Sequence, residues 1–207
     1  MLEFNFMDES ELLECADLAA RAFQSYEYFK NYIPDENRRR RFLKKLLRTE
    51  FKANAHLKNV RFIVAKEDGK IKAVAHICLP GFTRPSVRDY IKHGVLKAVL
   101  AGGISDVIAW SRMEEKATQP CHNLDTWYLS LLTVDPEFQG EGVGTSFLQD
   151  GIIPVIKDHG GHELCLFTNS MENRLFYKKN GFECFQEQYY IYMCKLLGSW
   201  SYIKYFN

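Results

Sequence analysis

A glycine-rich junction between a strand and a helix restricts the fold of this chain more than any other feature. Residues 126–134 (TWYLSLLTV) are mostly aromatic or branched, which predicts a central strand. Three glycines follow within five residues, Gly140, Gly142 and Gly144, just before a helical segment. Ordering glycine costs roughly 0.5–1 kcal/mol relative to alanine, so bare backbone must serve a purpose there. Backbone N–H groups that converge at a helix N-terminus bind anions such as pyrophosphate, and we expect that role.

The rest of the chain alternates strands and helices without a repeat or linker, which predicts one mixed α/β domain over residues 1–207. We expect strands over residues 2–6, 61–67, 71–78, 126–134, 164–168, 182–186 and 189–196. We expect a first helix that begins at an Asp8 cap and carries an apolar stripe over residues 12–23. We expect further helices over residues 36–54, 86–100 and 105–115, from the glycines to about residue 157, and over 172–179. Residues 79–124 form a helical insertion between the third and fourth strands, a candidate substrate cover.

Composition narrows the class of protein. The chain has 207 residues with a formal charge of +1, which does not indicate a nucleic-acid or anionic-membrane binder. No apolar run reaches the ~18 residues of a membrane span, and the N-terminus lacks the pattern of a secretory signal, so we expect a cytoplasmic protein. The basic run 38–48 has apolar residues at helical spacing, which favours an amphipathic helix with a solvated basic face over a phosphate-attracting rim. Six scattered cysteines are expected to be reduced thiols, mostly in the core: Cys15, Cys78, Cys121, Cys165, Cys184 and Cys194.

Two common nucleotide motifs do not fit the glycine loop. A Walker A loop needs a lysine after its last glycine, and a dinucleotide fingerprint needs a different glycine spacing. The loop instead reads Gln-x-x-Gly-x-Gly over residues 139–144, and residues 173–182 continue with Asn-x-x-Phe-Tyr-x-x-x-Gly-Phe. In this order, the two motifs resemble those of the GNAT superfamily of N-acetyltransferases. The segments 19–23, 127–129 and 173–177 look like the puromycin N-acetyltransferase type.

The resemblance implies a GNAT fold, in which helices flank a mixed, mostly antiparallel sheet of six to seven strands. It also implies acetyl-CoA as co-substrate, no metal, and direct transfer of the acetyl group to a primary amine of a small molecule in a ternary complex. The coenzyme site would comprise Leu132, Thr133, Val134, Gln139, Gly140, Glu141, Gly142, Val143, Gly144, Thr145, Asn173 and Tyr177. A backbone N–H near Leu132 would stabilise the oxyanion, and Tyr177 would act as general acid. Alternatively, Tyr177 only packs against the sulfur and Asn173 caps its helix.

Other parts of the site stay open at this stage. Histone-type GNAT members place a glutamate eleven residues before the glutamine, where this chain has Tyr128. The general base is therefore unassigned among Asp125, His122, Glu172, Tyr26, His76 and a water chain. Glu141 replaces the lysine or arginine of close relatives, and we expect its side chain to face solvent. Five aromatic residues are candidates for an acceptor pocket: Tyr26, Tyr28, Phe29, Tyr32 and Trp110.

Two further functions remain alternatives to a small-molecule acetyltransferase. A protein or peptide N-acetyltransferase would need an open groove, and a coenzyme-A-binding regulatory protein would have lost turnover. The histidines and cysteines do not cluster at ligand spacing, so no metal site is expected. No nucleic-acid or membrane partner is expected, and the protein would be a monomer or a homodimer.

Overall fold

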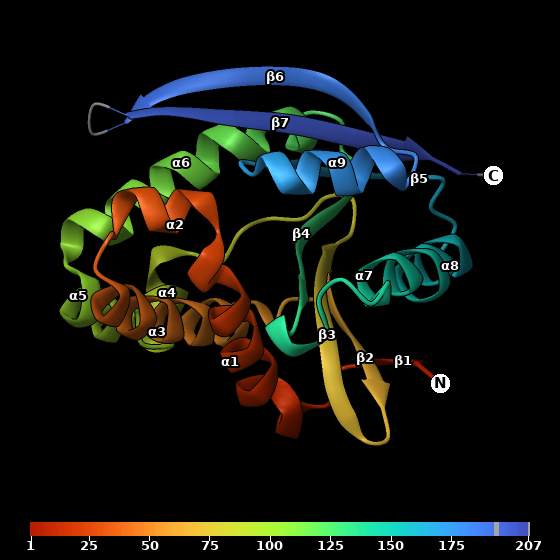
Figure 1. The fold of residues 1–207 in the computed structure, drawn as a ribbon, viewed down its shortest axis with the longest axis horizontal. Coiled ribbons are helices and arrows are strands. Elements are labelled where there is room, and N and C mark those ends of the chain that lie inside the picture. Colours follow the sequence, from red (N-terminus) through yellow and green to blue (C-terminus); the bar gives the residue numbers. More distant parts are fainter. Residues whose placement is uncertain (193–194, 207) are drawn as a thin grey trace.

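The computed structural model describes residues 1–192 and 195–206, and a seven-stranded sheet forms its centre (Figure 1). The strand order is β1-β2-β3-β4-β5-β7-β6, and every neighbouring pair is antiparallel except β4 and β5. The strands are β1 Glu3–Phe6, β2 Val60–Glu67, β3 Lys70–Cys78, β4 Trp127–Val134, β5 Glu163–Thr168, β6 Glu183–Tyr192 and β7 Lys195–Tyr205. The mixed, mostly antiparallel sheet with a helical insertion after its third strand confirms the expected fold class.

Helices cover both faces of the sheet. They are α1 Leu12–Ala22, α2 Glu27–Tyr32, α3 Glu36–Asn54, α4 Val87–Lys92, α5 Val95–Gly102, α6 Ile104–His122, α7 Val143–Ser146, α8 Ile153–Asp158 and α9 Met171–Lys179. A π-helical segment, Phe147–Ile152, joins α7 to α8. Alternate side chains of β3 enter two separate cores. Val74 packs with the core of α1 and α3, whereas Ile77 packs with the core of α7 and α8.

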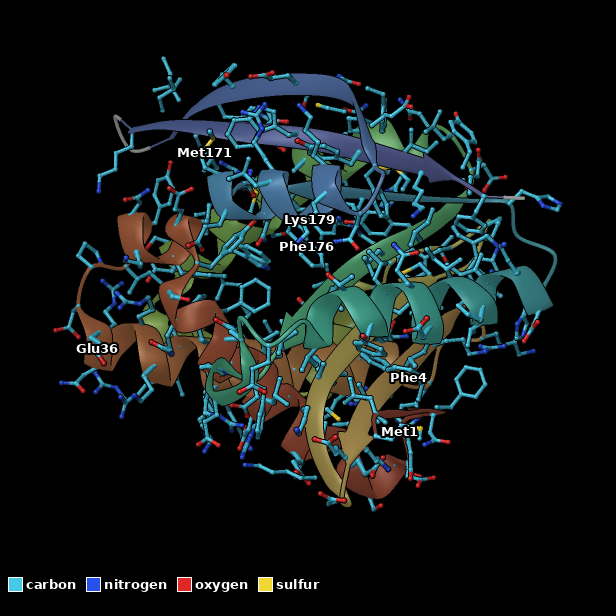
Figure 2. All side chains as sticks on the ribbon, turned by 45° about the vertical axis from the view of Figure 1, so that its right-hand side comes forward. Met1, Phe4, Glu36, Met171, Phe176 and Lys179 are labelled. Carbon is cyan, nitrogen blue, oxygen red and sulfur yellow. A yellow bond between two sulfur atoms is a disulfide. The ribbon has the colours of Figure 1, made fainter. Side chains whose placement is uncertain are left out.

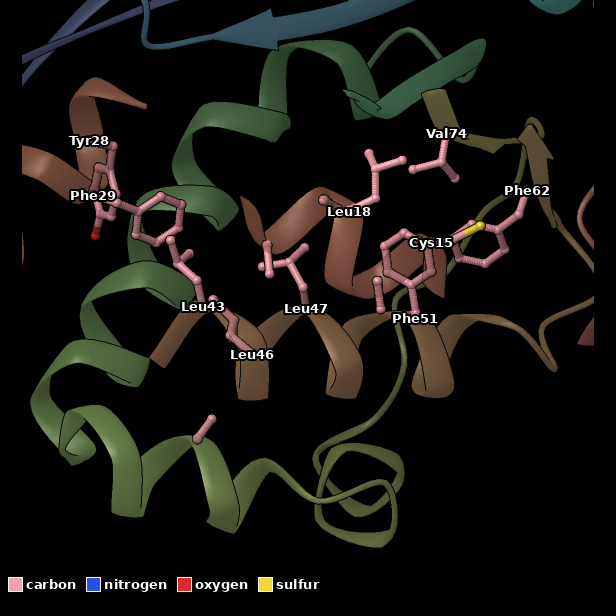
Figure 3. Packing of buried hydrophobic residues seen from close by; sticks show 14 of the residues in the cluster. Cys15, Leu18, Tyr28, Phe29, Leu43, Leu46, Leu47, Phe51, Phe62 and Val74 are labelled. Atoms are coloured by element: carbon pink, nitrogen blue, oxygen red, sulfur yellow. The ribbon is translucent and has the colours of Figure 1, made fainter. Parts of the chain in front are cut away.

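The core beneath α1 and α3 fixes the position of α3. Figure 3 shows Phe51 of α3 beside Cys15 of α1 and Phe62 of β2, and Leu43 directed toward Phe29 of α2. The ring of Phe51 lies 4.8 Å from that of Phe62 on β2, measured between centroids. Burying such side chains stabilises the fold by roughly 1.5–3 kcal/mol each, so the residues that flank Phe51 are held in place.

The basic helix α3 differs in one respect from the expected solvated face. Arg39 is buried, and its guanidinium donates hydrogen bonds to the carbonyl oxygens of Gln24, Ile33 and Pro34. Apolar spacing alone missed this arginine because its charge is satisfied by backbone carbonyls rather than by solvent. Arg48 forms a bidentate ion pair with Asp17 on α1. Arg40, Arg41, Lys44 and Lys45 are exposed, so the rest of the basic face is solvated as expected.

The insertion contains three helices where the sequence indicated two. The helix expected over residues 86–100 is interrupted at Gly94, whose φ of 102° is left-handed, so α4 and α5 are separate. The next helix, α6, continues past the expected residue 115 to His122 and contains Pro120. At the C-terminal end, residues 189–192 belong to β6 and 195–196 to β7, so the strand expected over 189–196 is wrong; its residues 193 and 194 lie outside the described part.

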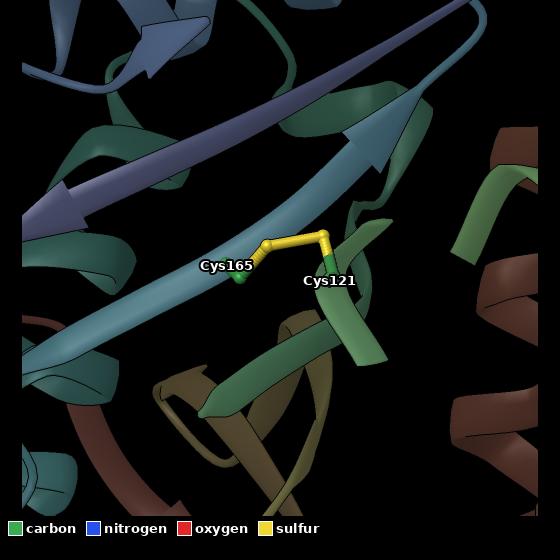
Figure 4. The surroundings of a disulfide bond; sticks show 2 residues. All are labelled: Cys121 and Cys165. Atoms are coloured by element: carbon green, nitrogen blue, oxygen red, sulfur yellow. A yellow bond between two sulfur atoms is a disulfide. The ribbon is translucent and has the colours of Figure 1, made fainter. Parts of the chain in front are cut away.

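The expectation that all cysteines are reduced is wrong for two of them. Cys121 near the end of α6 and Cys165 on β5 form a disulfide, with their Cα atoms 5.7 Å apart (Figure 4). Their sequence separation of 44 residues gave no signal, because only the packing of α6 against β5 brings them together. Free thiols are buried at Cys15 and Cys78 and exposed at Cys184; Cys194 lies outside the described residues. Along residues 1–192 and 195–206, no helix is long and apolar enough to cross a membrane.

Candidate active site

The sheet opens at its centre, between β4 and β5, which run parallel to each other. β4 and β5 pair at only two positions, Trp127 with Leu164 and Tyr128 with Cys165. A β-bulge follows in β4, where the pairing with β3 skips Ser130. Because a bulge bends its strand, β4 and β5 diverge beyond this point, and one edge of β4 has no neighbouring strand.

The hydrogen-bond pattern shows which backbone groups face this opening. The N–H of Asp135 donates to the carbonyl oxygen of Lys72 on β3, at 2.8 Å. Bonded and non-bonded pairs alternate along an antiparallel ladder. Thr133 therefore turns its N–H and C=O toward β3, whereas Leu132 and Val134 turn theirs toward the open edge. The side chain of Gln139 confirms this direction, because its Nε2 donates to the carbonyl oxygen of Val134 at 3.0 Å.

The glycine loop presents free N–H groups beside that edge. Gly140 and Gly142 both have a φ of 84°, a left-handed conformation that favours glycine. Gly142 is the N-cap of α7, and the N–H groups of residues 143–145 donate no backbone hydrogen bond within the described residues. Together with the helix dipole, these groups form an anion site of the kind that binds pyrophosphate. Glu141 is exposed and does not line the cavity described below, in keeping with the expected solvent-facing side chain.

Gly144 has a different structural reason. A Cβ built on it would lie 3.4 Å from the side chains of Phe176 and Val134, at the limit of ordinary van der Waals contact, so a side chain longer than alanine would push α7 away from α9. Figure 2 shows α9, with Met171, Phe176 and Lys179 labelled, across from the helical segment that begins with α7. Gly144 therefore permits close helix packing, whereas Gly140 and Gly142 shape the loop.

Tyr177 and Asn173 lie on the same side of α9 and both line the cavity. Burial, and then the neighbouring Tyr26, raises the pKa of Tyr177 above its usual value, so its phenol keeps its proton at neutral pH. Its hydroxyl makes no hydrogen bond within the described part of the chain. Ser170 caps α9, because its side chain accepts from the N–H of Asn173, so the cap alternative for Asn173 is wrong.

A cavity of about 790 Å³ connects these groups. It is lined by the open edge of β4 from Leu129 to Val134, by the glycine loop, and by α9. Its volume is within the usual range for ligand sites, and its unpaired strand edge offers backbone hydrogen bonds to an extended ligand. Eleven of the twelve predicted coenzyme residues line it, and Glu141 does not.

A sequence model of the acetyltransferase (GNAT) domain matches residues 58–184, which is more than half of the chain. The chain belongs to the GNAT acetyltransferase family. A search of curated proteins found no match.

Solved GNAT structures share the fold at low sequence identity. The PaiA N-acetyltransferase of Thermoplasma acidophilum in complex with coenzyme A is 14% identical, with a TM-score of 0.55 over 100% of this chain and 99% of that one. The ribosomal-protein-S18-alanine N-acetyltransferase of Escherichia coli is 14% identical, with a TM-score of 0.56 over 100% and 95%. A Corynebacterium glutamicum acetyltransferase related to the histone acetyltransferase HPA2 is 16% identical, with a TM-score of 0.60 over 97% and 94%. The puromycin N-acetyltransferase type stays a prediction.

The far end of the cavity in this GNAT chain is walled by α2, α3 and α6. Of the five predicted aromatic residues, Tyr26, Phe29 and Trp110 line it, whereas Tyr28 and Tyr32 do not. Tyr28 is buried against Phe29 and Trp110, with ring centroids 5.1 and 5.3 Å away. Three of the five side chains thus line the cavity, their role in an acceptor pocket stays a prediction, and Tyr28 belongs to the core behind them.

The candidate general bases differ in whether they line the cavity and in what their side chains contact. His122 and Asp125 do not line the cavity; the Asp125 carboxylate accepts a hydrogen bond from the N–H of Gly81 at 2.7 Å. His76 lines it, but burial lowers its pKa to about 3, so it is a neutral and weak base. The hydroxyl of Tyr26 accepts from the N–H of Asn169 at 2.8 Å, a structural contact. Glu172 is exposed where it lines the cavity.

Sequence reasoning missed two carboxylates in this cavity, Glu50 on α3 and Glu114 on α6. Each looked like one charge among many on an amphipathic helix. A weak signal existed for Glu50, because it directly precedes Phe51 in the apolar stripe of α3 and so borders the buried face.

Proposed function

We propose that this GNAT acetyltransferase uses acetyl-CoA to acetylate a primary amine of a small molecule, by direct attack within a ternary complex. The observation that carries the proposal is the open edge of β4. Leu132 and Val134 present backbone groups to a cavity that also contains the free N–H groups of residues 143–145 and an aromatic chamber. Donor and acceptor can therefore occupy the same cavity.

The chain fits the coenzyme through backbone groups. The free N–H groups of residues 143–145 would hold the pyrophosphate, and the amides of the pantetheine arm would pair with the edge of β4 like an added strand. The side chain of Asn173 makes no hydrogen bond within the described residues and lines the cavity, so it can bind the same arm. Acetyl-CoA supplies an activated acetyl group, and the chain supplies its orientation.

Two groups are suited to the chemical step. The N–H of Leu132 points to the open edge, where it would stabilise the negative charge that develops on the carbonyl oxygen during attack. The Tyr177 hydroxyl keeps its proton because its pKa is raised, and it would donate that proton to the departing sulfur. A buried, unpartnered phenol fits a general acid better than a packing aromatic.

A small acceptor is favoured by the shape of the far end. α6 contributes Trp110 and Glu114 to the cavity wall beside side chains from α2 and α3, and Trp110 stacks on Phe29 of α2. The insertion thus forms part of the wall on the acceptor side, whereas a protein substrate requires an open groove. The insertion's role as a substrate cover remains part of the proposal.

The test is release of free coenzyme A from acetyl-CoA with a panel of small amines and peptides. Tyr177→Phe should lower kcat by about 100-fold or more without changing coenzyme affinity, because general acids contribute 10²–10⁴ in rate. Tyr202→Phe is the matched control. The ring centroid of this buried tyrosine lies 6.2 Å from that of Tyr177, but Tyr202 does not line the cavity.

Each alternative predicts a different result. Turnover only with peptides would indicate a protein N-acetyltransferase. Tight acetyl-CoA binding without turnover on any amine would indicate a coenzyme-binding regulatory protein.

A further inference from the structure

Two glutamates from distant parts of the sequence meet at the far end of the cavity. Glu50 comes from α3 and Glu114 from α6 of the insertion, and both line the cavity that also contains Leu132 and Tyr177. Both are half-buried, and the side chain of Glu114 is 22% exposed. Each carboxylate is thus removed from bulk solvent but can be reached from the cavity.

The protein only partly satisfies these carboxylates. Oε2 of Glu50 accepts hydrogen bonds from the hydroxyl of Tyr90 at 3.0 Å and from Asn54 at 3.4 Å. Oε2 of Glu114 lies 3.7 Å from the guanidinium of Arg84, whose other terminal nitrogen donates to Thr118 at 2.7 Å. Within residues 1–192 and 195–206, Oε1 of either glutamate accepts no hydrogen bond.

When both glutamates of the pair are ionised, their two carboxyl groups carry one more negative charge than the neighbouring Arg84 neutralises. Arg84 is the cation beside it, and it faces two carboxyl groups. Burial, and then the nearby Glu114, raises the pKa of Glu50 to about 8, and burial raises the pKa of Glu114. At neutral pH without a ligand, the pair therefore retains a proton, because burial disfavours the charged carboxylates and the negative charge of Glu114 adds to this effect at Glu50. A bound cation would replace that proton.

The surroundings suit a cation attached to an apolar body. Trp110 and Phe29 stack with ring centroids 4.8 Å apart and line the cavity with Phe51 and Phe62. Aromatic faces attract cations and bind apolar groups. His76 adds no positive charge because its pKa is lowered to about 3. The two lysines that line the cavity, Lys30 and Lys179, are exposed.

The indole N–H of Trp110 is a further polar group without a partner. Its Nε1 is buried and has no hydrogen-bond partner in the part of the chain that the structure describes. A buried N–H without a partner costs free energy, which a small rotation of the ring toward an acceptor on a ligand would relieve. This group and the two Oε1 atoms lie on residues of the same wall.

We propose that this wall is the acceptor subsite of the enzyme, and that Glu50 and Glu114 select acceptor amines that arrive as ammonium ions on an aromatic or apolar body. The inference rests on the proposed function and adds the class of its acceptor. Glu50 and Glu114 bind and orient the ammonium group, and the aromatic side chains bind the body that carries it. A carboxylate of the pair then accepts the extra proton of the ammonium group, so that the neutral amine attacks the thioester. Acidic amino compounds are excluded by the same charges, and neutral compounds without an amino group bind less tightly.

The test uses a cation that cannot form a stable amide, so that its outcome does not depend on turnover. Binding of N,N-dimethyl-2-phenylethylamine and of the neutral 2-phenylethanol to the full chain is measured by calorimetry, with coenzyme A present. We expect the ammonium compound to bind at least ten-fold more tightly. In the Glu50→Gln, Glu114→Gln double variant, this preference should fall to about two-fold, with coenzyme A affinity unchanged.

Glu115→Gln is the matched control, because Glu115 is exposed on the same helix and should leave the preference intact. Should the double variant fail to fold, Glu50→Gln alone keeps acceptors for Tyr90 and Asn54 and should lower the preference at least three-fold. Equal affinity for the two compounds in the wild type, absence of ammonium binding, or a preference that survives in the folded double variant would each overturn the proposal. A protein that shows the preference but no acetyl transfer would refute the proposed function alone.

Discussion

The two ends of the cavity are formed by different kinds of groups, backbone at one end and side chains at the other. At the donor end, the ligand would meet backbone: the open edge of β4 and the N–H groups of a glycine loop, all within residues 132–145. At the acceptor end it would meet side chains from α2, α3 and α6, brought together from positions as far apart in the sequence as Phe29 and Glu114. Backbone recognition is local and independent of side-chain identity, whereas side-chain recognition depends on how helices pack. The two ends should therefore respond separately to mutation.

The largest difference between the two ends is expected when the disulfide is removed, because it links α6 of the acceptor wall to β5 of the sheet. Replacing Cys121 and Cys165 by serine should lower the free energy of unfolding by about 2–4 kcal/mol, because the bond closes a long loop. Acceptor binding should weaken more than coenzyme binding, since α6 carries Trp110 and Glu114. Urea unfolding measures the first effect and calorimetry the second. Cys184→Ser, at an exposed free thiol, is the control; equal unfolding midpoints for all three proteins would contradict the prediction.

A change in the glycine loop should affect only the donor end. Gly142→Ala should weaken coenzyme A binding by about 10–100-fold, since a side chain at a φ of 84° is strained by roughly 1–2 kcal/mol and relaxation would turn the N–H groups away. Gly69→Ala is matched, because Gly69 has a φ of 74°, open space around it, and a place in the β2–β3 turn. It should cost similar stability but leave coenzyme affinity within two-fold. Similar losses of affinity in both variants would show that strain alone acts.

At the acceptor end, ionisation of Glu50 should make the free energy of unfolding depend on pH. The raised pKa of Glu50 means that the folded chain holds a proton that the unfolded chain loses near pH 4.5. Stability is therefore lost as pH rises from about 4.5 to about 8. Glu50→Gln removes this loss, and we expect it to gain about 1–2 kcal/mol relative to wild type at pH 8.5 and little at pH 5, an amount reduced by water in the cavity. Urea titrations at the two pH values measure it, and a pH-independent difference would contradict it.

The smallest effect is expected for the exposed charge in the glycine loop. Glu141→Lys should tighten acetyl-CoA binding about two- to three-fold, because it replaces repulsion of the phosphates by attraction across solvent. The gain should shrink at high salt. Glu183→Lys, an exposed change of the same charge on β6, should leave affinity unchanged. Unchanged or weaker binding by the Glu141 variant in calorimetry would refute the prediction.

The same contrast explains what could be predicted from the sequence. The central strand, the glycine loop and α9 follow from local signals, so the fold class and the location of residues 139–145 were predicted well. Gly144 was assigned to the anion site, although its contact with Phe176 required knowledge of how α7 meets α9. Glu50, Glu114 and the partners in the disulfide could not be predicted, because each becomes significant only through an element that is distant in sequence. The turn at Gly94 and the length of α6 were missed because propensity is weak beside tertiary packing.

Backbone N–H and C=O groups face alternate sides along β4, so the enzyme depends more on the number of residues in this strand than on their side chains. Any β-forming side chain at residue 132 leaves its N–H directed at the open edge, so substitutions there preserve the group that would stabilise the oxyanion. Removing one residue between Ser130 and Leu132 would exchange the two sets of backbone groups, and the donor end would then face β3. An insertion or deletion of one residue is therefore the change that β4 tolerates least.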